Sequence, residues 1–570
     1  MLYLIFAWGL LGLASWVIGL TILNGLRISC FIRQGDRFVM AIWLGLVLLS
    51  NILLALALGT ALSSSVGIGV GIVTLLLVGC WRAELRQTLR ALSLSQWASL
   101  LAVTLVIAYY TSQRVTWIDA GLYHFGATRW LAEFGAVPGL ALLLDNFGFT
   151  SAWFALTALL SPATIAPRVS AVTNSFVLFI MIVAGLIALH RCLNRQAQVS
   201  DWFMAVSLTL ILPILFLTTF MSAILVSSSP DIPVIFLTIM VAWSVLTLMN
   251  HNLSNIDNIK DHLGDASLIP VILAAGALAI KLTALPLLPV ALLFHWSRQF
   301  FNIKRLLVGV AVALLILLPN IAMGAVVSGC PFYPVSTLCL DLPWTLTDAK
   351  ASNAAELIRG WDRWFGSLPE ESNPVLWRIW QWLKFARLNI VMLLLLLASV
   401  IIAPKTLKTA RKLKVMGVPW LFSLGILGMI FILLRAPMIR FGLGYFVVPT
   451  AVAIAVFMCR PSIHVSLSRW QSEQAMRLLP IAVWGAVGVL FFSQRAMLSE
   501  RLLLPPAMPS AKTVLRQSHD VTYAFPTSER RLCWTAPLPC SRGIDNVQLR
   551  NPDKGIAAGF TRASKSEPRD

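Results

Sequence analysis

The sequence predicts an all-α protein, a polytopic transmembrane bundle of about 12–14 helices, and three observations lead to this fold class. Apolar residues make up 58% of the 570-residue chain and charged residues only 12%. That charged share is about half of what a soluble globular protein carries. The apolar residues gather in runs of roughly 20, the length a helix needs to cross a hydrocarbon core about 30 Å thick. Short clusters of Lys and Arg separate these runs, as the cytoplasmic loops of membrane proteins require.

Apolar runs of this kind predict the following single membrane spans: 3–24, 38–59, 66–81, 97–113, 169–189, 203–226, 233–250, 306–325, 389–403, 417–434, 441–459 and 478–495. The stretch 268–296 is too long for one span and carries Lys281 at its middle. We therefore expect two short helices that turn at Lys281-Leu282-Thr283. The first run, Leu2 to Leu23, lacks a basic leading segment and a small-residue cleavage site, which indicates a retained helix rather than a signal peptide.

The positions of Lys and Arg in the short loops predict the orientation of the chain in the membrane. The basic clusters are Arg27, Arg33 and Arg37; Arg82, Arg86 and Arg90; Arg298, Lys304 and Arg305; and Lys405, Lys408, Arg411, Lys412 and Lys414. Placing all of them in the cytoplasm makes the crossings alternate from end to end, although the 250–267 loop then lies inside with a single Lys against three Asp. The expected regions are N-terminal transmembrane helices 1–113, an external loop 114–168, transmembrane helices 169–325, an external Trp-rich loop 326–388, transmembrane helices 389–495 and an external tail 496–570.

Charge and motifs exclude two classes of function. The net charge of +20 does not indicate a nucleic-acid partner, because the basic residues lie in short clusters between apolar runs rather than in one patch. The sequence has no GxxxxGKS/T loop, so an ATP-driven pump is not expected.

The cysteines agree with this orientation. Cys330 and Cys339 lie in one expected external loop and Cys533 and Cys540 in the tail, whereas Cys30, Cys80, Cys192 and Cys459 lie at or near cytoplasmic ends. Disulfides form outside the cytosol, so we expect local pairs 330–339 and 533–540. Free thiols and cross-pairing between the two regions remain alternatives.

The segment most indicative of chemistry follows the span 97–113. From Leu122 to Phe134, apolar residues recur at roughly helical spacing, which predicts a helix lying along the bilayer surface. Asp119 precedes this helix at the point where the chain leaves the membrane. It could take a proton from an acceptor hydroxyl as a general base, or it could cap the surface helix by accepting from backbone amides.

The local sequence of this segment, "WIDAGLYHFGATRWLAEFGAVPGLALLLDNFGFTSAWF", resembles that of a set of large bacterial multi-pass membrane proteins. The placement of an acid after a span and before an interfacial helix resembles the GT-C membrane glycosyltransferases, which include the protein mannosyltransferase and aminoarabinose transferase group (glycosyltransferase family 39-like). Further similar pieces are Ser228-Ser229-Pro230-Asp231, Lys281-Leu-Thr, Pro331-Phe-Tyr333-Pro334, Asp341-Leu-Pro-Trp344, Arg435-Ala-Pro-Met-Ile-Arg440-Phe-Gly, and Cys533-Trp through Pro539-Cys540. Ala120 stands where many GT-C enzymes carry a second acid.

The resemblance implies a glycosyltransferase of the bacterial inner membrane whose active site faces the periplasm. Such an enzyme takes a sugar from a polyprenyl phosphate and passes it to a glycan, lipid or protein acceptor, in contact with membrane lipid, with Asp119 as the general base. Arg435 and Arg440 flank a short external turn and would hold the phosphate, since an Arg fork matches phosphate oxygens. The alternative for each is an arginine that snorkels to the membrane surface.

Three further residues are candidates for substrate contacts. Lys281 lies within an apolar stretch, where an ionisable residue usually faces protein or a water-filled cavity. It would bind phosphate or substrate, or form a structural ion pair with Asp231. Asp231 would bind sugar or acceptor, or cap the next helix. His124 would assist Asp119 or contact a sugar hydroxyl, or act as an ordinary hydrogen-bonding residue.

Several questions stay open at the level of sequence. The tryptophans of the 326–388 loop suit stacking on sugars as well as anchoring at the membrane surface. Some GT-C enzymes use a divalent metal and others do not, and no dense carboxylate cluster here requires one. The alternatives to an enzyme are a transporter or flippase of lipid-linked glycans and a non-catalytic assembly protein that keeps the GT-C scaffold.

Overall fold

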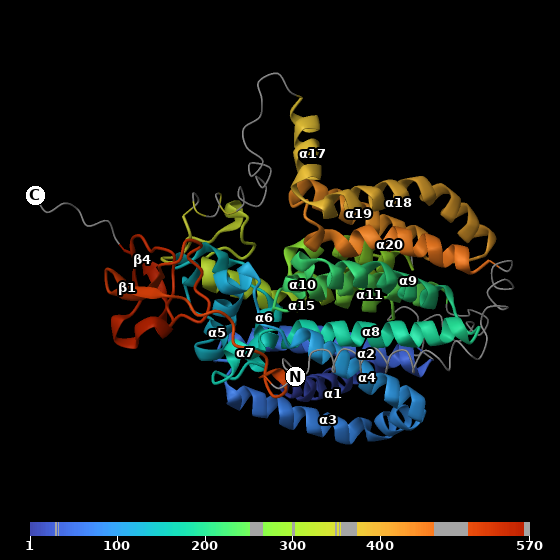
Figure 1. The fold of residues 1–570 in the computed structure, drawn as a ribbon, viewed down its shortest axis with the longest axis horizontal. Helices are drawn as coiled ribbons and strands as arrows, with labels where there is room; N and C mark the ends of the chain where they lie inside the picture. Colours follow the sequence, from blue (N-terminus) through green and yellow to red (C-terminus); the bar gives the residue numbers. More distant parts are fainter. Residues whose placement is uncertain are drawn as a thin grey trace, which may run out of the picture.

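The computed structural model describes residues 1–28, 31, 33–250, 266–298, 302–347, 350, 352, 354, 373–460 and 500–563. Figure 1 shows long helices running side by side in a bundle, with shorter helices and the β-strands gathered at one end. Eleven helices in the described part are long and apolar enough to cross a membrane. The chain is thus mostly helical and fits a multi-pass integral membrane protein.

Each helix of spanning length overlaps a predicted span. These helices are α1 (Leu2–Gly25), α2 (Gln34–Ala57), α3 (Ser64–Arg90), α4 (Leu94–Thr111), α8 (Val172–Leu193), α9 (Val199–Leu217), α11 (Asp231–Asn250), α15 (Ile303–Ser328), α18 (Arg387–Lys412), α19 (Val418–Arg435) and α20 (Ile439–Met458). The predicted span 203–226 is interrupted, because Thr218 has an extended backbone between α9 and α10 (Thr219–Leu225). The predicted span 478–495 and the loop 251–265 lie outside the described residues.

The stretch around Lys281 forms a helical hairpin. Helix α13 (Leu268–Ile280) ends at Lys281, whose backbone is extended, and a short 3₁₀ turn, η5 (Leu282–Ala284), leads into α14 (Leu287–Ser297). The two helices run antiparallel, because Ser267 Oγ at the start of one lies 2.6 Å from His295 Nδ1 near the end of the other. The predicted pair of short helices turning at Lys281 is confirmed.

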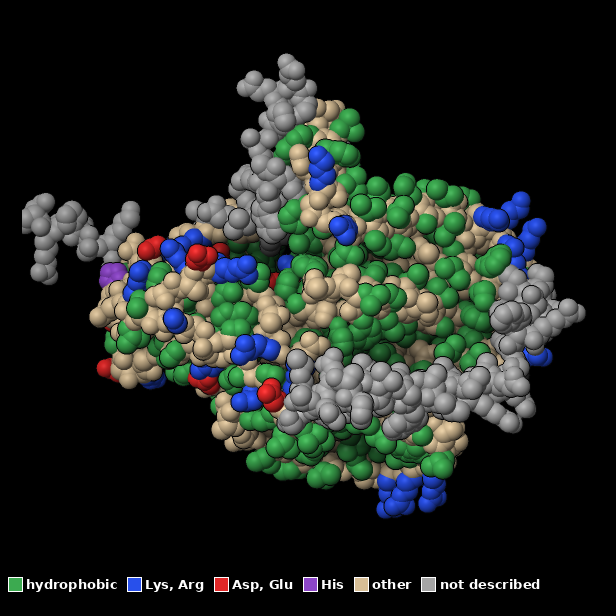
Figure 2. Space-filling view, viewed as in Figure 1, with side chains coloured by type: hydrophobic (Ala, Val, Ile, Leu, Met, Phe, Trp, Pro, Cys, Tyr) green, Lys and Arg blue, Asp and Glu red, His purple; other side chains and the backbone are tan. Residues whose placement is uncertain are grey.

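Burial divides the bundle into a core and a rim. The core contains α11, almost every side chain of which is buried, whereas few side chains of α3 and α18 are buried. Figure 2 shows apolar side chains over the flank of the bundle and clusters of Lys and Arg near its ends, as expected where a bilayer surrounds the flank. Helices α1 and α2 meet at two glycines: a Cβ at Gly19 would lie 1.7 Å from the Ala41 carbonyl oxygen, and one at Gly45 would lie 1.8 Å from that of Ser15. Small residues allow this close approach of membrane helices.

The helix predicted from Leu122 to Phe134 is present as a π-helical turn, η1 (Ala120–His124), that continues into α5 (Phe125–Glu133). Its apolar side chains are covered by protein: Phe125 and Trp130 are buried, and Trp130 packs edge-on against Phe560 of the tail. The expectation that this face lies along the bilayer surface is therefore corrected, because the tail and α6 (Ala152–Leu159) occupy it. Other short elements at this end are η2 (Leu140–Leu142), η3 (Asp145–Gly148) and α7 (Ala166–Val169).

The C-terminal tail adds four short β-strands to the otherwise helical chain. Strands β1 (Thr513–Ser518) and β2 (Val521–Pro526) pair antiparallel, as do β3 (Val547–Leu549) and β4 (Phe560–Arg562), with η8 (Pro552–Ala558) between the last two. The tail packs onto the 114–168 region: the Phe560 amide donates to Pro138, and the Met508 amide donates to Pro167.

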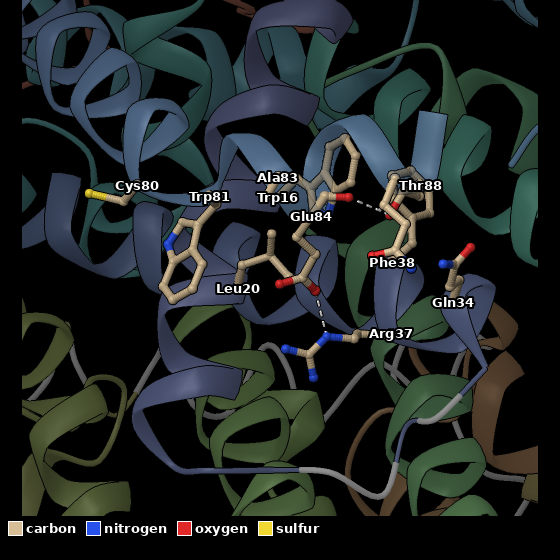
Figure 3. A pocket seen from close by; sticks show the side chains of 11 residues that line it. Trp16, Leu20, Gln34, Arg37, Phe38, Cys80, Trp81, Ala83, Glu84 and Thr88 are labelled. Atoms are coloured by element: carbon tan, nitrogen blue, oxygen red, sulfur yellow. Dashed lines mark hydrogen bonds and ion pairs between the residues drawn. The ribbon is translucent and has the colours of Figure 1, made fainter. Parts of the chain in front are cut away.

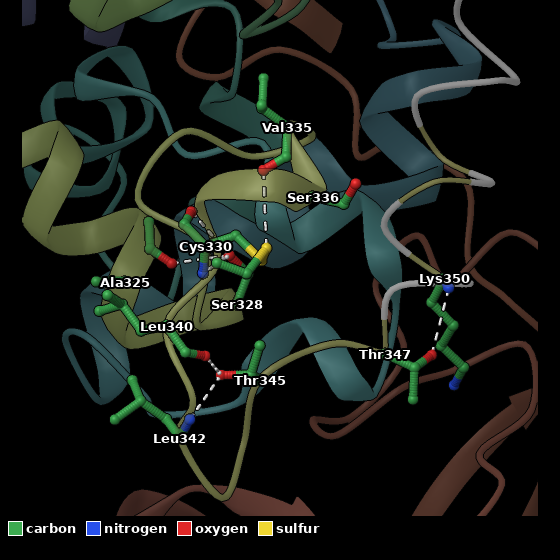
Figure 4. The surroundings of a disulfide bond; sticks show 12 residues. Ala325, Ser328, Cys330, Val335, Ser336, Leu340, Leu342, Thr345, Thr347 and Lys350 are labelled. Atoms are coloured by element: carbon green, nitrogen blue, oxygen red, sulfur yellow. Dashed lines mark hydrogen bonds between the residues drawn. A yellow bond between two sulfur atoms is a disulfide. The ribbon is translucent and has the colours of Figure 1, made fainter.

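Both predicted disulfides are present. Cys330 pairs with Cys339 and Cys533 with Cys540, while Cys80, Cys192 and Cys459 are free thiols. Figure 4 shows the first disulfide beyond the end of α15, where the Cys330 amide donates to Ser328 Oγ at 3.1 Å. This loop continues through η6 (Ser336–Leu338), and α17 (Pro374–Phe385) precedes α18. Residues 355–372 of the Trp-rich loop, with Trp361 and Trp364, lie outside the described residues.

Candidate functional site

Four ionisable side chains from distant parts of the sequence meet at one end of the bundle. Arg440 donates to Asp119 at 2.7 Å and lies 3.9 Å from Asp231. Asp231 in turn forms an ion pair with Lys281. We call Asp119, Asp231, Lys281 and Arg440 the charge cluster; it contains two acids and two bases and is formally neutral.

Each member of the charge cluster stands at or next to a helix end. Arg440 lies in the first turn of α20, and Asp231 begins α11. Lys281 follows the last residue of α13, at the tip of the hairpin. A helix N-terminus favours an anion and a C-terminus favours a cation, so the two helix dipoles stabilise the charges of Asp231 and Lys281.

Asp119 does not act as a helix cap. It precedes η1, but its side chain makes no capping hydrogen bond, and it accepts from Arg440 instead. The capping alternative for Asp119 is therefore wrong. The Asp231 carboxylate has its own partner besides the two cations, since Ser229 Oγ donates to it at 2.9 Å.

Aromatic rings surround the two cations. The Arg440 guanidinium lies over the rings of Trp117 and Phe441, at 5.1 and 4.5 Å from the ring centroids. Lys281 Nζ lies 4.5 Å from the centroid of the same Phe441 ring. Such contacts hold cations in place while leaving their N–H donors available for oxygen ligands.

His124 lies beside this cluster but outside its ion pairs. Its side chain is buried, its ring contacts those of Tyr123 and Phe154, and Nδ1 has no hydrogen-bond partner among the described residues. Burial lowers the pKa of His124 to about 4, against the opposing charge of Asp119. The imidazole is therefore neutral at physiological pH, and such a ring can donate one hydrogen bond and accept another.

The pKa of the Asp119 carboxyl lies below its usual value. Burial would raise it, but the positive charge of Arg440 and the hydrogen bond that it donates, with a smaller contribution from Lys281, outweigh burial. The carboxylate is thus ionised in this arrangement, as a proton acceptor must be.

The two arginines that were both predicted to hold phosphate, Arg435 and Arg440, lie in different surroundings. Arg440 points into the charge cluster, whereas Arg435 is exposed at the end of α19 and has no ion pair to another described residue. Of the predicted site residues, Asp119, Asp231, Lys281 and Arg440 come together, His124 lies next to them, and Arg435 does not join them.

Sequence reasoning missed the contribution of the tail. Trp534, next to the Cys533–Cys540 disulfide, donates its backbone amide to the Gly121 carbonyl at 2.9 Å. A Cβ at Gly121 would lie 2.5 Å from the Trp534 ring, so glycine is needed for the tail to cover η1. Gly121 and Trp534 both lie in segments that carry the resemblance to GT-C enzymes. They are more than 400 positions apart in the sequence, so no local pattern predicts their contact.

A cavity lies between the first turns of α2 and the helices α1 and α3, away from the charge cluster. Its volume is about 570 Å³. Figure 3 shows the side chains that line it, and among them Arg37 and Glu84 form an ion pair at 2.6 Å. Nearby, Arg33 and Arg191 pair with Asp36 and Asp201. These acids and bases neutralise one another within the protein. Among the described residues, no group of three or more His, Cys, Asp or Glu is placed to hold a metal ion.

Comparison with known proteins gives one match. The model of a family described as "Domain of unknown function (DUF8201)" matches residues 1–447, a range that contains all four members of the charge cluster. The comparisons with curated proteins and with solved structures gave no match.

Proposed function

The chain belongs to the DUF8201 family, and for it we propose the activity of a GT-C-like membrane glycosyltransferase. It would move a sugar from a polyprenyl-phosphate donor to an acceptor hydroxyl at the outer face of a bacterial inner membrane. The observation that supports this most is the charge cluster itself. It combines a carboxylate able to accept a proton with two cations able to hold a phosphate, at the ends of apolar helices.

The cations supply the donor half of the proposed reaction. The leaving group is a lipid phosphate, on which negative charge grows as the bond to the sugar breaks, and fixed positive charge stabilises it. Arg440 presents a planar fork for two phosphate oxygens, and Lys281 a compact ammonium beside it. The aromatic rings of Trp117 and Phe441 hold both in place.

Asp119 supplies the acceptor half. The carboxylate takes the proton of the acceptor hydroxyl while the hydroxyl oxygen attacks the anomeric carbon. The carbon–oxygen bond to the phosphate breaks, and its electron pair leaves with the polyprenyl phosphate, so the anomeric configuration inverts. In the free protein Arg440 lowers the pKa of Asp119, which weakens it as a base. A bound phosphate shares Arg440 and raises that pKa again, so the base becomes stronger when the donor is in place.

The test compares Asp119→Asn with Arg435→Gln in lipid nanodiscs supplied with a panel of labelled polyprenyl-phosphate sugars. The readout is loss of sugar from the donor, including slow transfer to water. We expect turnover by the wild type and by Arg435→Gln, and a fall of about 10²–10⁴-fold in Asp119→Asn with the thermal unfolding profile preserved. Equal turnover in Asp119→Asn and wild type would remove the base assignment. A wild type that moves intact donor across the bilayer without losing its sugar would favour the flippase alternative.

A further inference from the structure

Helix α17 (Pro374–Phe385) lies crosswise to the bundle. Figure 1 shows its axis roughly perpendicular to α18, α19 and α20, projecting sideways from the end of α18. If the bundle helices cross the membrane, a helix perpendicular to them lies parallel to the membrane plane. Two hydrogen bonds fix its C-terminal end: Trp382 Nε1 donates to the Pro437 carbonyl at 2.6 Å, and Asn389 Nδ2 donates to the Trp382 carbonyl at 2.7 Å.

The side of α17 turned away from the protein is strongly apolar. Leu376 is 67% exposed, Trp380 56% and Ile379 46%, and at helical spacing these three positions share one face. Large apolar side chains gathered on one exposed face mark a surface that something covers. Trp382, on a different side of the helix, is buried against protein.

The charges of α17 and its junction with α18 all have the same sign. Between Asn373 and Arg387 the sequence contains Arg378, Lys384 and Arg387 and no acidic residue. Lys384 Nζ lies 4.7 Å from the Trp380 ring centroid, so its charge sits at the border of the apolar face. Basic residues beside an apolar face with Trp and Leu are the features of a helix that lies in the interface of a bilayer containing anionic lipid.

We propose that α17 lies in the outer interface of the bilayer, with Leu376, Ile379 and Trp380 among the lipid chains, and that it gathers phosphate-headed lipids beside the charge cluster. The first half is independent of the catalytic assignment, whereas the second rests on the proposed function. The path from α17 to the site is short: Trp382 is hydrogen-bonded to Pro437, which lies just before α20 and precedes Arg440 by three residues. A lipid phosphate attracted to Lys384 and Arg387 is then next to the turn that carries the phosphate-binding arginine.

The location is tested on the full chain in nanodiscs that contain anionic lipid. Cys30, Cys80, Cys192 and Cys459 are replaced by Ser, and a spin label is attached through Ile379→Cys or, on the polar side, through Gln381→Cys. We expect the label at 379 to be accessible to oxygen and shielded from a water-soluble nickel chelate, and the label at 381 to show the opposite. Exposure of both labels to nickel would overturn the proposal. Shielding of position 379 from both reagents would overturn it too, because it would mean that protein, such as a second copy of the chain, covers this face.

The recruiting role is tested with Lys384→Gln/Arg387→Gln. If α17 gathers phosphate-headed lipid, KM for the lipid donor rises by roughly 5-fold for each removed charge while kcat is unchanged. Lys408→Gln/Lys412→Gln is the matched control, since it removes two exposed charges from the far end of α18. An equal KM in both double variants would overturn the recruiting role and leave the spin-label result intact. Absence of turnover in every variant would count against the proposed function instead, and the recruiting role would fall with it.

Discussion

The ion pair between Lys281 and Asp231 has a contribution to stability that can be separated from substrate binding. The Asp231 side chain is 1% exposed and that of Lys281 20%. Lys281→Met leaves the buried carboxylate with Ser229 Oγ and with Arg440 at 3.9 Å. Removing one partner of a buried pair costs about 3–5 kcal/mol. Because Arg440 remains nearby, we expect a loss at the lower end, about 3 kcal/mol of the free energy of unfolding.

The double variant Lys281→Met/Asp231→Asn removes both charges and keeps the cluster neutral, with Asp119 and Arg440 still paired. It should regain at least about 2 kcal/mol relative to Lys281→Met, because no unpaired buried charge remains. A double-mutant cycle, measured by reversible unfolding in mixed micelles, gives this coupling directly. The matched control is Lys408→Met, an exposed lysine of α18.

Donor binding in the same variants decides what else Lys281 does. If Lys281 holds the donor phosphate as well as Asp231, the double variant regains stability while its donor affinity stays reduced. Stability losses that simply add, with no coupling between positions 281 and 231, would refute the ion pair as a structural element. Recovery of both stability and donor affinity would show that Lys281 serves structure alone.

Two further predictions concern His124, which lies beside the charge cluster, and the contact between Gly121 and the C-terminal tail. Burial lowers the pKa of His124 to about 4, whereas an unfolded His titrates near 6.5. Stability is therefore full above pH ~6.5 and falls by about 3 kcal/mol as the pH drops to ~4. His124→Gln should remove this slope from a pH series of unfolding curves, and an unchanged slope would contradict the assignment. Gly121→Ala should loosen the tail, because the added methyl group would lie 2.5 Å from the Trp534 ring. Limited proteolysis should then cut the tail faster than in wild type or in Gly9→Ala, where a Cβ meets nothing within 4 Å, and equal rates in all three would show that this contact does not hold the tail.

The sequence predicted the parts of the structure that depend on local composition. Runs of apolar residues near the length of a bilayer gave the spans, and one lysine inside such a run gave the hairpin that turns at Lys281. The disulfides followed from short separations within regions expected on the same side. Strands β1 to β4 were missed, because each is only three to six residues long and such segments carry little periodic signal.

The composition of the site was harder to predict because it depends on contacts between distant segments. Position alone made Arg435 and Arg440 equivalent, and only the path of the turn between α19 and α20 points one inward and leaves the other exposed. Asp119 was equally suited to cap η1, and the presence of Arg440 within 2.7 Å decided against it. The surface helix appeared lipid-facing because the tail that covers it comes more than 380 residues later in the chain.

The pairing of Asp119 with Arg440 makes one prediction that distinguishes the proposed site from a simple structural ion pair. In the free protein the Asp119 carboxylate occupies the Arg440 fork at 2.7 Å, so a donor phosphate has to compete with it. Asp119→Asn removes the competing charge. A hydrogen bond to a charged group contributes about 1.5–3 kcal/mol, and its loss should tighten donor binding by roughly 10-fold or more while turnover falls. Equilibrium binding of a polyprenyl phosphate to wild type and Asp119→Asn in nanodiscs measures this, with Glu133→Gln as control, since Glu133 pairs with Arg129 on the surface. If Asp119→Asn binds the lipid phosphate more weakly than wild type, Arg440 is not the phosphate ligand and Asp119 contributes to the site in another way.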